Sequence, residues 1–257
     1  MKILFCGAHP DDAEIYAFGT LLAWREAGAS VTIFIAAQGN MGTKDRTAGR
    51  DLSEVRRAEA ERSAAMIGAK LVTAGLTDLG IAPNRFRLAN HLQTVAHSEQ
   101  PDVIITHSPN DYHIDHRALS GVVGLAAGDD FPIIHVDTMK GAHFQPTHFV
   151  DIGRHQDRKF ECLRQHHSQK PRRYVLAALE LAARRGKQAT GLEGQYMEAF
   201  RFAPGPKFKH AEKFFPPGTI EAHTIILPAP GGRPLAPGSY QINIDDPADR
   251  SAAKRSA

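Results

Sequence analysis

The segment KILFCGAHPDDAE (residues 2–14) carries the first signs of both the fold and the chemistry of this chain. Its first half, residues 2–7, is an apolar run that favours a buried β-strand. Its second half places one histidine and three acidic residues within six positions, directly after that strand. A helix cap explains one acidic residue at such a point, but it does not explain the whole cluster. We therefore expect a functional site at the carboxyl end of the first strand.

Short apolar runs alternate with helix-like segments along most of the chain. Apolar periodicity and turn residues predict strands over 2–7, 30–38, 70–76, 102–108, 131–138, 148–153 and 195–203. The same signals predict helices over 11–28, 51–68, 85–99, 115–128, 154–167 and 172–188. Such alternation forms parallel βαβ units with right-handed crossovers. The expected class is α/β: a doubly wound, mainly parallel Rossmann-like sheet with helices on both faces.

Composition narrows the class of protein. The chain has 257 residues, 42% hydrophobic and 23% charged, which is typical of a globular domain. Its net charge of +3 is too small to indicate a nucleic-acid partner. The two cysteines, Cys6 and Cys162, lie far apart and fit a reducing compartment. No run approaches the roughly 18 apolar residues of a membrane span, and the N-terminus reads as a strand rather than a signal peptide. We expect a cytoplasmic protein.

The composition changes at residue 204, where proline and glycine become frequent. We predict one catalytic domain over residues 1–203 and a Pro/Gly-rich C-terminal extension over 204–257 that is partly extended or disordered. Two readings of the extension stay open. It is either a tail that wraps over the domain, or an arm that joins subunits of a homo-oligomer or covers the site.

A second cluster, HSPNDYHIDHRALSG (residues 107–121), follows the strand predicted over 102–108. His113 and His116 are three residues apart, with Asp115 between them. Ligands in doubly wound sheets bind at the carboxyl ends of strands where the strand order reverses, and the first and fourth strands are neighbours there. We therefore expect the two clusters to form one pocket.

Histidine and aspartate side chains at such a point favour a catalytic metal ion. A catalytic zinc takes three nitrogen or oxygen ligands and keeps one position for water, whose pKa it lowers to about 7. Other divalent first-row metals suit the same donors. The expected ligands are His9, Asp12 and His116. Asp11 is then placed to take the water's proton, while His113 faces a developing oxyanion and Asp115 fixes the tautomer of His113 and keeps it protonated.

These motifs also carry a family resemblance. AHPDDAE (residues 8–14) followed by NDYHIDHR (110–117) resembles the PIG-L (LmbE-like) zinc-dependent N-deacetylases, over about residues 1–203. Ile114 stands where the family often has proline, a change that leaves the chemical groups intact. The resemblance implies His9, Asp12 and His116 as zinc ligands, Asp11 as general base and His113 as oxyanion stabiliser or acid.

Three further residues are candidates for substrate binding. EVRRAEAERSAAMIG (residues 54–68) is similar to a family helix, so Arg56 either contacts substrate or forms an exposed pair with Glu59. DRKFECLRQHHSQ (157–169) is similar to a late family helix. His166 therefore either lies at the pocket rim or interacts favourably with the dipole at the end of that helix. Tyr112 precedes His113 directly, one residue away from the position of a tyrosine in some members.

The resemblance implies metal-dependent removal of the N-acetyl group from an N-acetyl amino sugar or its conjugate, a small-molecule substrate, with release of acetate and a free amine. Two alternatives stay open. One is an amidase that cleaves a larger acyl amide of an amino-sugar conjugate, and the other is a non-catalytic sugar- or nucleotide-binding α/β protein. The chain has no GxGxxG after its first strand, no GxSxG elbow and no P-loop.

Overall fold

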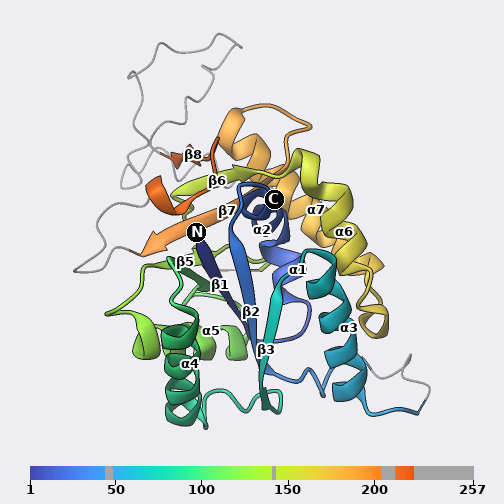
Figure 1. Cartoon of the computed structure of the whole chain (residues 1–257). Coiled ribbons are helices and arrows are strands. Elements are labelled where there is room, and N and C mark those ends of the chain that lie inside the picture. Colours follow the sequence, from blue (N-terminus) through green and yellow to red (C-terminus); the bar gives the residue numbers. More distant parts are fainter. Residues whose placement is uncertain (44–48, 141–142, 204–211, 223–257) are drawn as a thin grey trace.

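The computed structural model describes residues 1–43, 49–140, 143–203 and 212–222. Its strands are β1 (Lys2–Gly7), β2 (Ser30–Ala37), β3 (Lys70–Leu76), β4 (Val103–His107), β5 (Ile133–Val136), β6 (His148–Asp151), β7 (Met197–Ala203) and β8 (Ile220–Glu221). They form one eight-stranded sheet in the order β3-β2-β1-β4-β5-β7-β6-β8 (Figure 1).

Neighbouring strands pair in parallel from β3 to β5 and antiparallel from β5 through β7 and β6 to β8. From β1 the chain first adds β2 and β3 on one side and then crosses back to add β4 on the other, with Cys6 of β1 opposite Thr106 of β4. The strand order therefore reverses between β1 and β4. The predicted α/β class and its mainly parallel core are confirmed.

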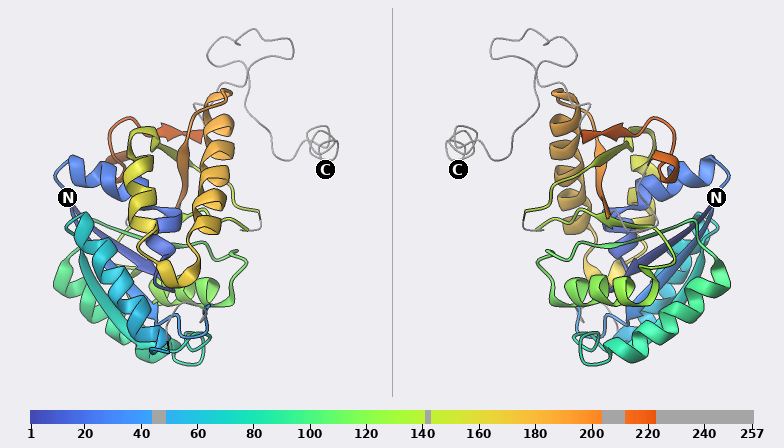
Figure 2. Two further views of the ribbon diagram at one scale, coloured as in Figure 1. Left: turned by 90° about the vertical axis from the view of Figure 1, so that its right-hand side faces the viewer. Right: turned by 90° about the vertical axis from the view of Figure 1, so that its left-hand side faces the viewer.

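Helices cover both faces of the sheet (Figure 2). They are α1 (Asp12–Tyr16), α2 (Phe18–Glu26), α3 (Leu52–Met66), α4 (Arg85–Glu99), α5 (Ile114–Ala127), α6 (Gln156–Leu163) and α7 (Arg172–Thr190), with 3₁₀ turns at Gly153–His155, His167–Gln169 and Glu212–Phe214. None of the helices in the described ranges has the length and apolarity needed to cross a bilayer.

Alternate side chains of the central strands fill two separate cores, because successive residues of a strand point to opposite faces. Leu4 and Ile104 pack with α4 and α5 on one face. Phe5 and Ile105 pack with α1, α2, α3, α6 and α7 on the other. With all four side chains buried, the end of β1 is held firmly beside the end of β4.

One predicted helix is broken in the structure. The segment 11–28 forms α1 and α2, which are separated at Ala17, where φ is −136°. The buried Glu198 carboxylate of β7 explains the break, because it accepts the Thr20 backbone N–H (2.7 Å) at the start of α2. Lys159 of α6 pairs with Glu198 (2.7 Å) and donates to a carbonyl of α1. The predicted single helix is therefore wrong, since a distant ion pair provides the end of one helix and the start of the next.

Part of the C-terminal extension packs on the domain. Within residues 212–222, β8 pairs antiparallel with β6 and adds the last strand of the sheet. Phe215 is buried and stacks on His148, with 4.1 Å between ring centroids. The rest of the extension, 204–211 and 223–257, lies outside the described residues, as does the predicted role of that part in subunit contacts.

Candidate metal centre

The candidate site lies at the carboxyl ends of β1 and β4. The chain leaves β1 and enters α1 at Asp12, and it leaves β4 and enters α5 at Ile114. Both connections end at the start of a helix, next to each other at the point where the strand order reverses (Figure 1). The structure thus brings together the two polar clusters that the sequence placed a hundred residues apart.

The turn between β1 and α1 has an unusual backbone. Asp11 has φ 122° and ψ −16°, a backbone conformation that residues other than glycine rarely adopt. The Asp12 carboxylate accepts the backbone N–H of His9 at 2.8 Å and closes this turn. Strained residues of this kind are concentrated at active sites, where the surrounding structure holds them in place. Here the turn sends the two neighbouring carboxylates to different partners.

Asp12 is the centre of a group of imidazoles. Its Oδ1 lies 3.3 Å from His116 Nε2, and its Oδ2 lies 3.1 Å from His107 Nε2 and 3.8 Å from His9 Nδ1. Burial raises the pKa of Asp12, but His116 and His107 outweigh burial and hold the pKa well below its ordinary value. Asp12 is therefore an ionised, buried carboxylate, which is the form that binds a metal ion.

Two further carboxylates lie against the far sides of the rings. His9 Nε2 is 3.1 Å from Asp115 Oδ2, and His116 Nδ1 is 3.0 Å from Asp111 Oδ2. Metal-binding histidines ordinarily place their second nitrogen on a carboxylate or carbonyl, which fixes the orientation of the ring. In both rings the other nitrogen faces Asp12, so the donors present fit a divalent ion.

The carboxylates around His116 favour its protonated form. Burial lowers the pKa of His116, but Asp12 and Asp111 outweigh it and raise the pKa to about 10. The imidazolium of His116 then neutralises the buried carboxylates. A divalent cation would replace this proton, because a metal-bound imidazole must be neutral.

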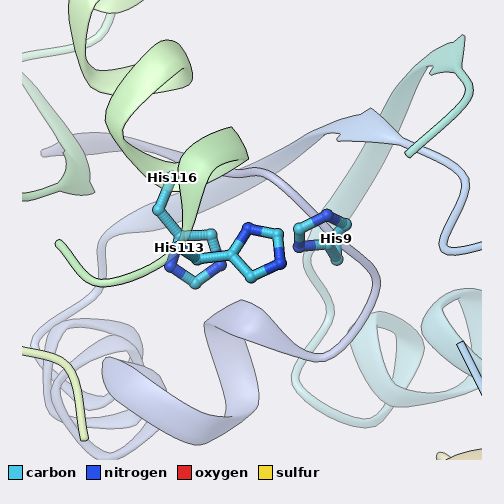
Figure 3. A group of neighbouring side chains, drawn as sticks. All are labelled: His9, His113 and His116. Atoms are coloured by element: carbon cyan, nitrogen blue, oxygen red, sulfur yellow. The ribbon is translucent and has the colours of Figure 1, made fainter. Parts of the chain in front are cut away.

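In the described ranges, two groups of three side chains could each hold a metal ion, because one ligand atom from each side chain lies within 4.8 Å of the other two. These are His9 with His113 and His116, and Asp12 with His107 and His116. The predicted ligand set, His9, Asp12 and His116, takes members from both groups and is not itself one of them. Figure 3 shows His113 and His116 extending from the start of α5 towards His9.

His107 and His113 have contacts that favour other roles. His107 is fully buried, stacks on His116 with 3.8 Å between ring centroids, and does not line the pocket at the site. An ion held by His107 would therefore be out of reach of a substrate. His113 Nδ1 accepts the Asp115 backbone N–H (3.2 Å) as the N-cap of α5. These contacts favour the predicted set over either alternative.

The expected link between the Asp115 carboxylate and His113 is wrong. That carboxylate contacts His9 and accepts the backbone N–H of Leu79 at 2.8 Å. The backbone N–H of Asp115 fixes the His113 tautomer instead, which leaves the ring proton on Nε2. Burial lowers the pKa of His113, so this histidine is neutral rather than protonated. The sequence alone could not show whether His113 contacts the side chain or the main chain of Asp115.

Asp11 lies beside two cationic groups. Arg56 Nη2 is 3.0 Å from Asp11 Oδ2, and the Arg56 guanidinium also donates to the carbonyls of Gly39 and Pro10. Burial raises the pKa of Asp11, while Arg56 and then His166 lower it, and the net shift is upwards. Asp11 is therefore a stronger base than an exposed aspartate, and it is oriented by Arg56.

The three predicted substrate contacts have different outcomes. Arg56 is buried and lines the pocket, and Glu59 is engaged by Ser168, so an exposed Arg56–Glu59 pair is wrong. Tyr112 lines the pocket and is 42% exposed, so its contact with substrate stays a prediction.

His166 is not at the pocket rim. It is 1% exposed, and its Nε2 lies 3.3 Å from Glu14 Oε1. Burial lowers the pKa of His166, but Glu14 and Asp11 outweigh burial and raise it. Its position behind Asp11 explains its influence on that carboxylate, and the expected direct contact with substrate is wrong.

A pocket of about 460 Å³ opens at the site, within the range of ligand-binding cavities. Most of the other residues that line the pocket carry no readable motif in the sequence. They include the loop residues Met41, Gly42, Thr43, Asp78 and Leu79, and Arg173 and Tyr174 of the first turn of α7. Gln169 belongs to the HSQ segment, and its Oε1 accepts the Thr43 backbone N–H at 3.1 Å. That segment was the one available signal for this wall of the pocket.

Comparisons with known proteins agree with this geometry. Residues 4–127 match the PIG-L family, described as GlcNAc-PI de-N-acetylase. The chain is 27% identical over 229 residues to the diacetylchitobiose deacetylase of Thermococcus kodakarensis, covering 79% of this chain and 84% of that protein. It also superposes on N,N'-diacetylchitobiose deacetylase from Pyrococcus horikoshii with a TM-score of 0.67 and 25% identity, over 79% and 84% of the two chains.

The same fold also occurs in an enzyme with other chemistry. The 4-carboxy-2-hydroxymuconate hydratase of Pseudomonas putida KT2440 superposes with a TM-score of 0.65 at 20% identity, over 81% of this chain and 98% of that one. This likeness concerns the fold alone. The reaction must therefore be argued from the side chains at the site.

Proposed function

Because residues 4–127 match the PIG-L family, described as GlcNAc-PI de-N-acetylase, we propose that the chain removes the N-acetyl group from an N-acetyl amino sugar or its conjugate. The products are acetate and a free amine. The curated relative and the structural neighbour at 25% identity both act on diacetylchitobiose, an N-acetyl amino sugar. Their names support the substrate class and leave the rest of the substrate open.

One observation carries the proposal: Asp12 lies between His9 Nδ1 and His116 Nε2, while the other nitrogen of each ring lies on a carboxylate. We propose His9, Asp12 and His116 as the ligands of a divalent ion, and zinc as that ion, because two imidazoles and one carboxylate with an open position suit catalytic zinc. Such an ion supplies a Lewis acid that polarises the amide carbonyl and lowers the pKa of water.

Asp11 is the proposed general base. Its pKa, raised by burial, favours acceptance of a proton from the attacking water. Arg56 at 3.0 Å orients the carboxylate and favours its ionised form. After the attack on the amide carbon, the proton held by Asp11 can pass to the departing nitrogen, which leaves as the free amine.

His113 is the proposed stabiliser of the oxyanion. Its Nδ1 is engaged by the backbone of α5, so its Nε2–H is available to donate a hydrogen bond. Because burial keeps this ring neutral, it can donate without adding a full positive charge beside the metal ligands. Asp115, which orients His9, is a positioning residue rather than a catalytic one.

The experiment that tests the proposal measures acetate release from a panel of N-acylated glucosamines, with and without a chelator. We expect metal-dependent acetate release from N-acetyl substrates, with longer N-acyl chains cleaved more slowly. Faster cleavage of the longer acyl amides would favour the alternative amidase. Purified protein that binds no stoichiometric divalent metal and releases no acid would favour the non-catalytic binding protein.

A further inference from the structure

The pocket extends beyond the metal centre to the first turn of α7. Arg173 and Tyr174 line it together with His9, Asp12 and His116. Its volume of about 460 Å³ is larger than an acetyl group needs. The outer part of the pocket is therefore available for the sugar and for whatever group the sugar carries.

Among the residues that the structure describes, each acidic side chain that lines this pocket has a partner. Asp11 pairs with Arg56, and Asp12 lies among the histidine rings. Asp78 accepts the backbone N–H groups of residues 39 and 41 at 2.7 and 2.9 Å. The three described carboxylates of the lining are thus hydrogen-bonded or ion-paired within the protein.

Arg173 differs from the other arginine of the pocket. Arg56 is buried and pairs with Asp11, whereas no carboxylate in the described part of the chain pairs with Arg173. The Arg173 guanidinium lies over the Tyr174 ring, 4.6 Å from its centroid, and Nη2 donates to the Tyr174 hydroxyl at 2.6 Å. Tyr174 therefore holds the guanidinium in place, and within the described residues no further hydrogen bond of its other N–H groups is found.

A second cation, Lys140, lies beside the pocket residue Tyr112. Lys140 Nζ is 5.8 Å from the centroid of the Tyr112 ring, and that ring lies 5.9 Å from the rings of His113 and His116. The Tyr112 ring is therefore a neighbour both of Lys140 and of the two histidines.

We propose that the outer pocket binds an anionic group, a phosphate or a carboxylate, carried by the amino sugar away from its acetamide, with Arg173 as the recognising side chain. A planar guanidinium offers two parallel N–H donors to such an oxyanion. The proposal rests on the proposed deacetylase function, and it predicts that an acidic conjugate is a better substrate than a neutral chito-oligosaccharide.

The test compares kcat/KM for three substrates: the neutral methyl glycoside of N-acetylglucosamine, N-acetylglucosamine 1-phosphate, and the glycoside of glycolic acid, which carries a carboxylate. We expect Arg173→Gln to lower the ratio of anionic to neutral kcat/KM about tenfold, mainly through KM, since a hydrogen bond to a charged group is worth that much or more. The matched control is Arg172→Gln, an exposed arginine of the same turn that does not line the pocket. It should leave the ratio unchanged.

The phosphate and carboxylate arms identify the anion that is preferred. A wild-type enzyme that prefers the neutral glycoside, or an Arg173→Gln variant with an unchanged ratio, would overturn the proposal while leaving deacetylation intact. If no substrate is deacetylated, the proposed function fails instead. Calorimetric binding of N-acetylglucosamine 1-phosphate to wild type and Arg173→Gln then decides the matter, and equal affinities would overturn the anion site.

Discussion

The Asp115→Asn substitution tests how the metal centre is supported. Asp115 Oδ2 lies 3.1 Å from His9 Nε2 and accepts the Leu79 backbone N–H at 2.8 Å. Asparagine keeps an oxygen for the Leu79 N–H, but it removes the negative charge behind the His9 ring. Loss of a carboxylate behind a metal-binding histidine weakens metal binding about 10–100-fold, or about 1.4–2.7 kcal/mol. Asp115 is 1% exposed, so solvent screens little of this loss.

The assay is competition for zinc against a chromophoric chelator at constant pH. Asp130→Asn is the matched control, because Asp130 Oδ2 lies 3.6 Å from His97 Nε2 on the surface, away from the site. We expect weaker zinc binding by Asp115→Asn and unchanged binding by the control. Wild-type zinc affinity together with a shifted pH profile of kcat would refute this reasoning, because it would show that Asp115 acts on His113 instead.

Three further predictions concern charged groups around the site and in the core. Arg56→Gln removes the main group that lowers the pKa of Asp11, so the acidic limb of the pH profile of kcat/KM should move to higher pH; an unmoved limb would mean that Asp11 is not the base. With the pKa of His116 at about 10, zinc binding at pH 7.5 should release about one proton and tighten as pH rises, as calorimetry in buffers of different ionisation enthalpy can measure; no release would count against His116 as a ligand. Lys159→Met leaves the Glu198 charge buried and unpaired, so urea denaturation should show a loss of about 3–5 kcal/mol in the free energy of unfolding, and a loss below 1 kcal/mol would contradict the cost assigned to burial.

The parallel half of the fold could be predicted from the sequence because local signals dominate it. The helix predicted over 85–99 has those bounds in the structure, and the first strand matches over residues 2–7. The break at Ala17 could not be predicted, because the Glu198 carboxylate that produces it comes from β7. The strand β8 was missed for a related reason, since it has two residues and is itself the edge strand, formed through its pairing with β6.

The candidate site divides in the same way. Strand order alone was sufficient to bring His9, Asp12 and His116 near one another, because β1 and β4 are neighbours. The hydrogen-bond and ion-pair partners of the carboxylates could not be predicted from the sequence, because they depend on side-chain conformation. Asp115 contacts His9 rather than His113, and this difference decides whether its loss affects metal binding or proton transfer.

The most direct test of the central claim is a zinc-edge anomalous difference map from crystals of the zinc-loaded protein. We predict a single peak at the pocket, bonded to His9 Nδ1, an oxygen of Asp12 and His116 Nε2. A peak bonded to His107, or one bonded to His113 and not to Asp12, would contradict the proposed ligand set and the mechanism built on it.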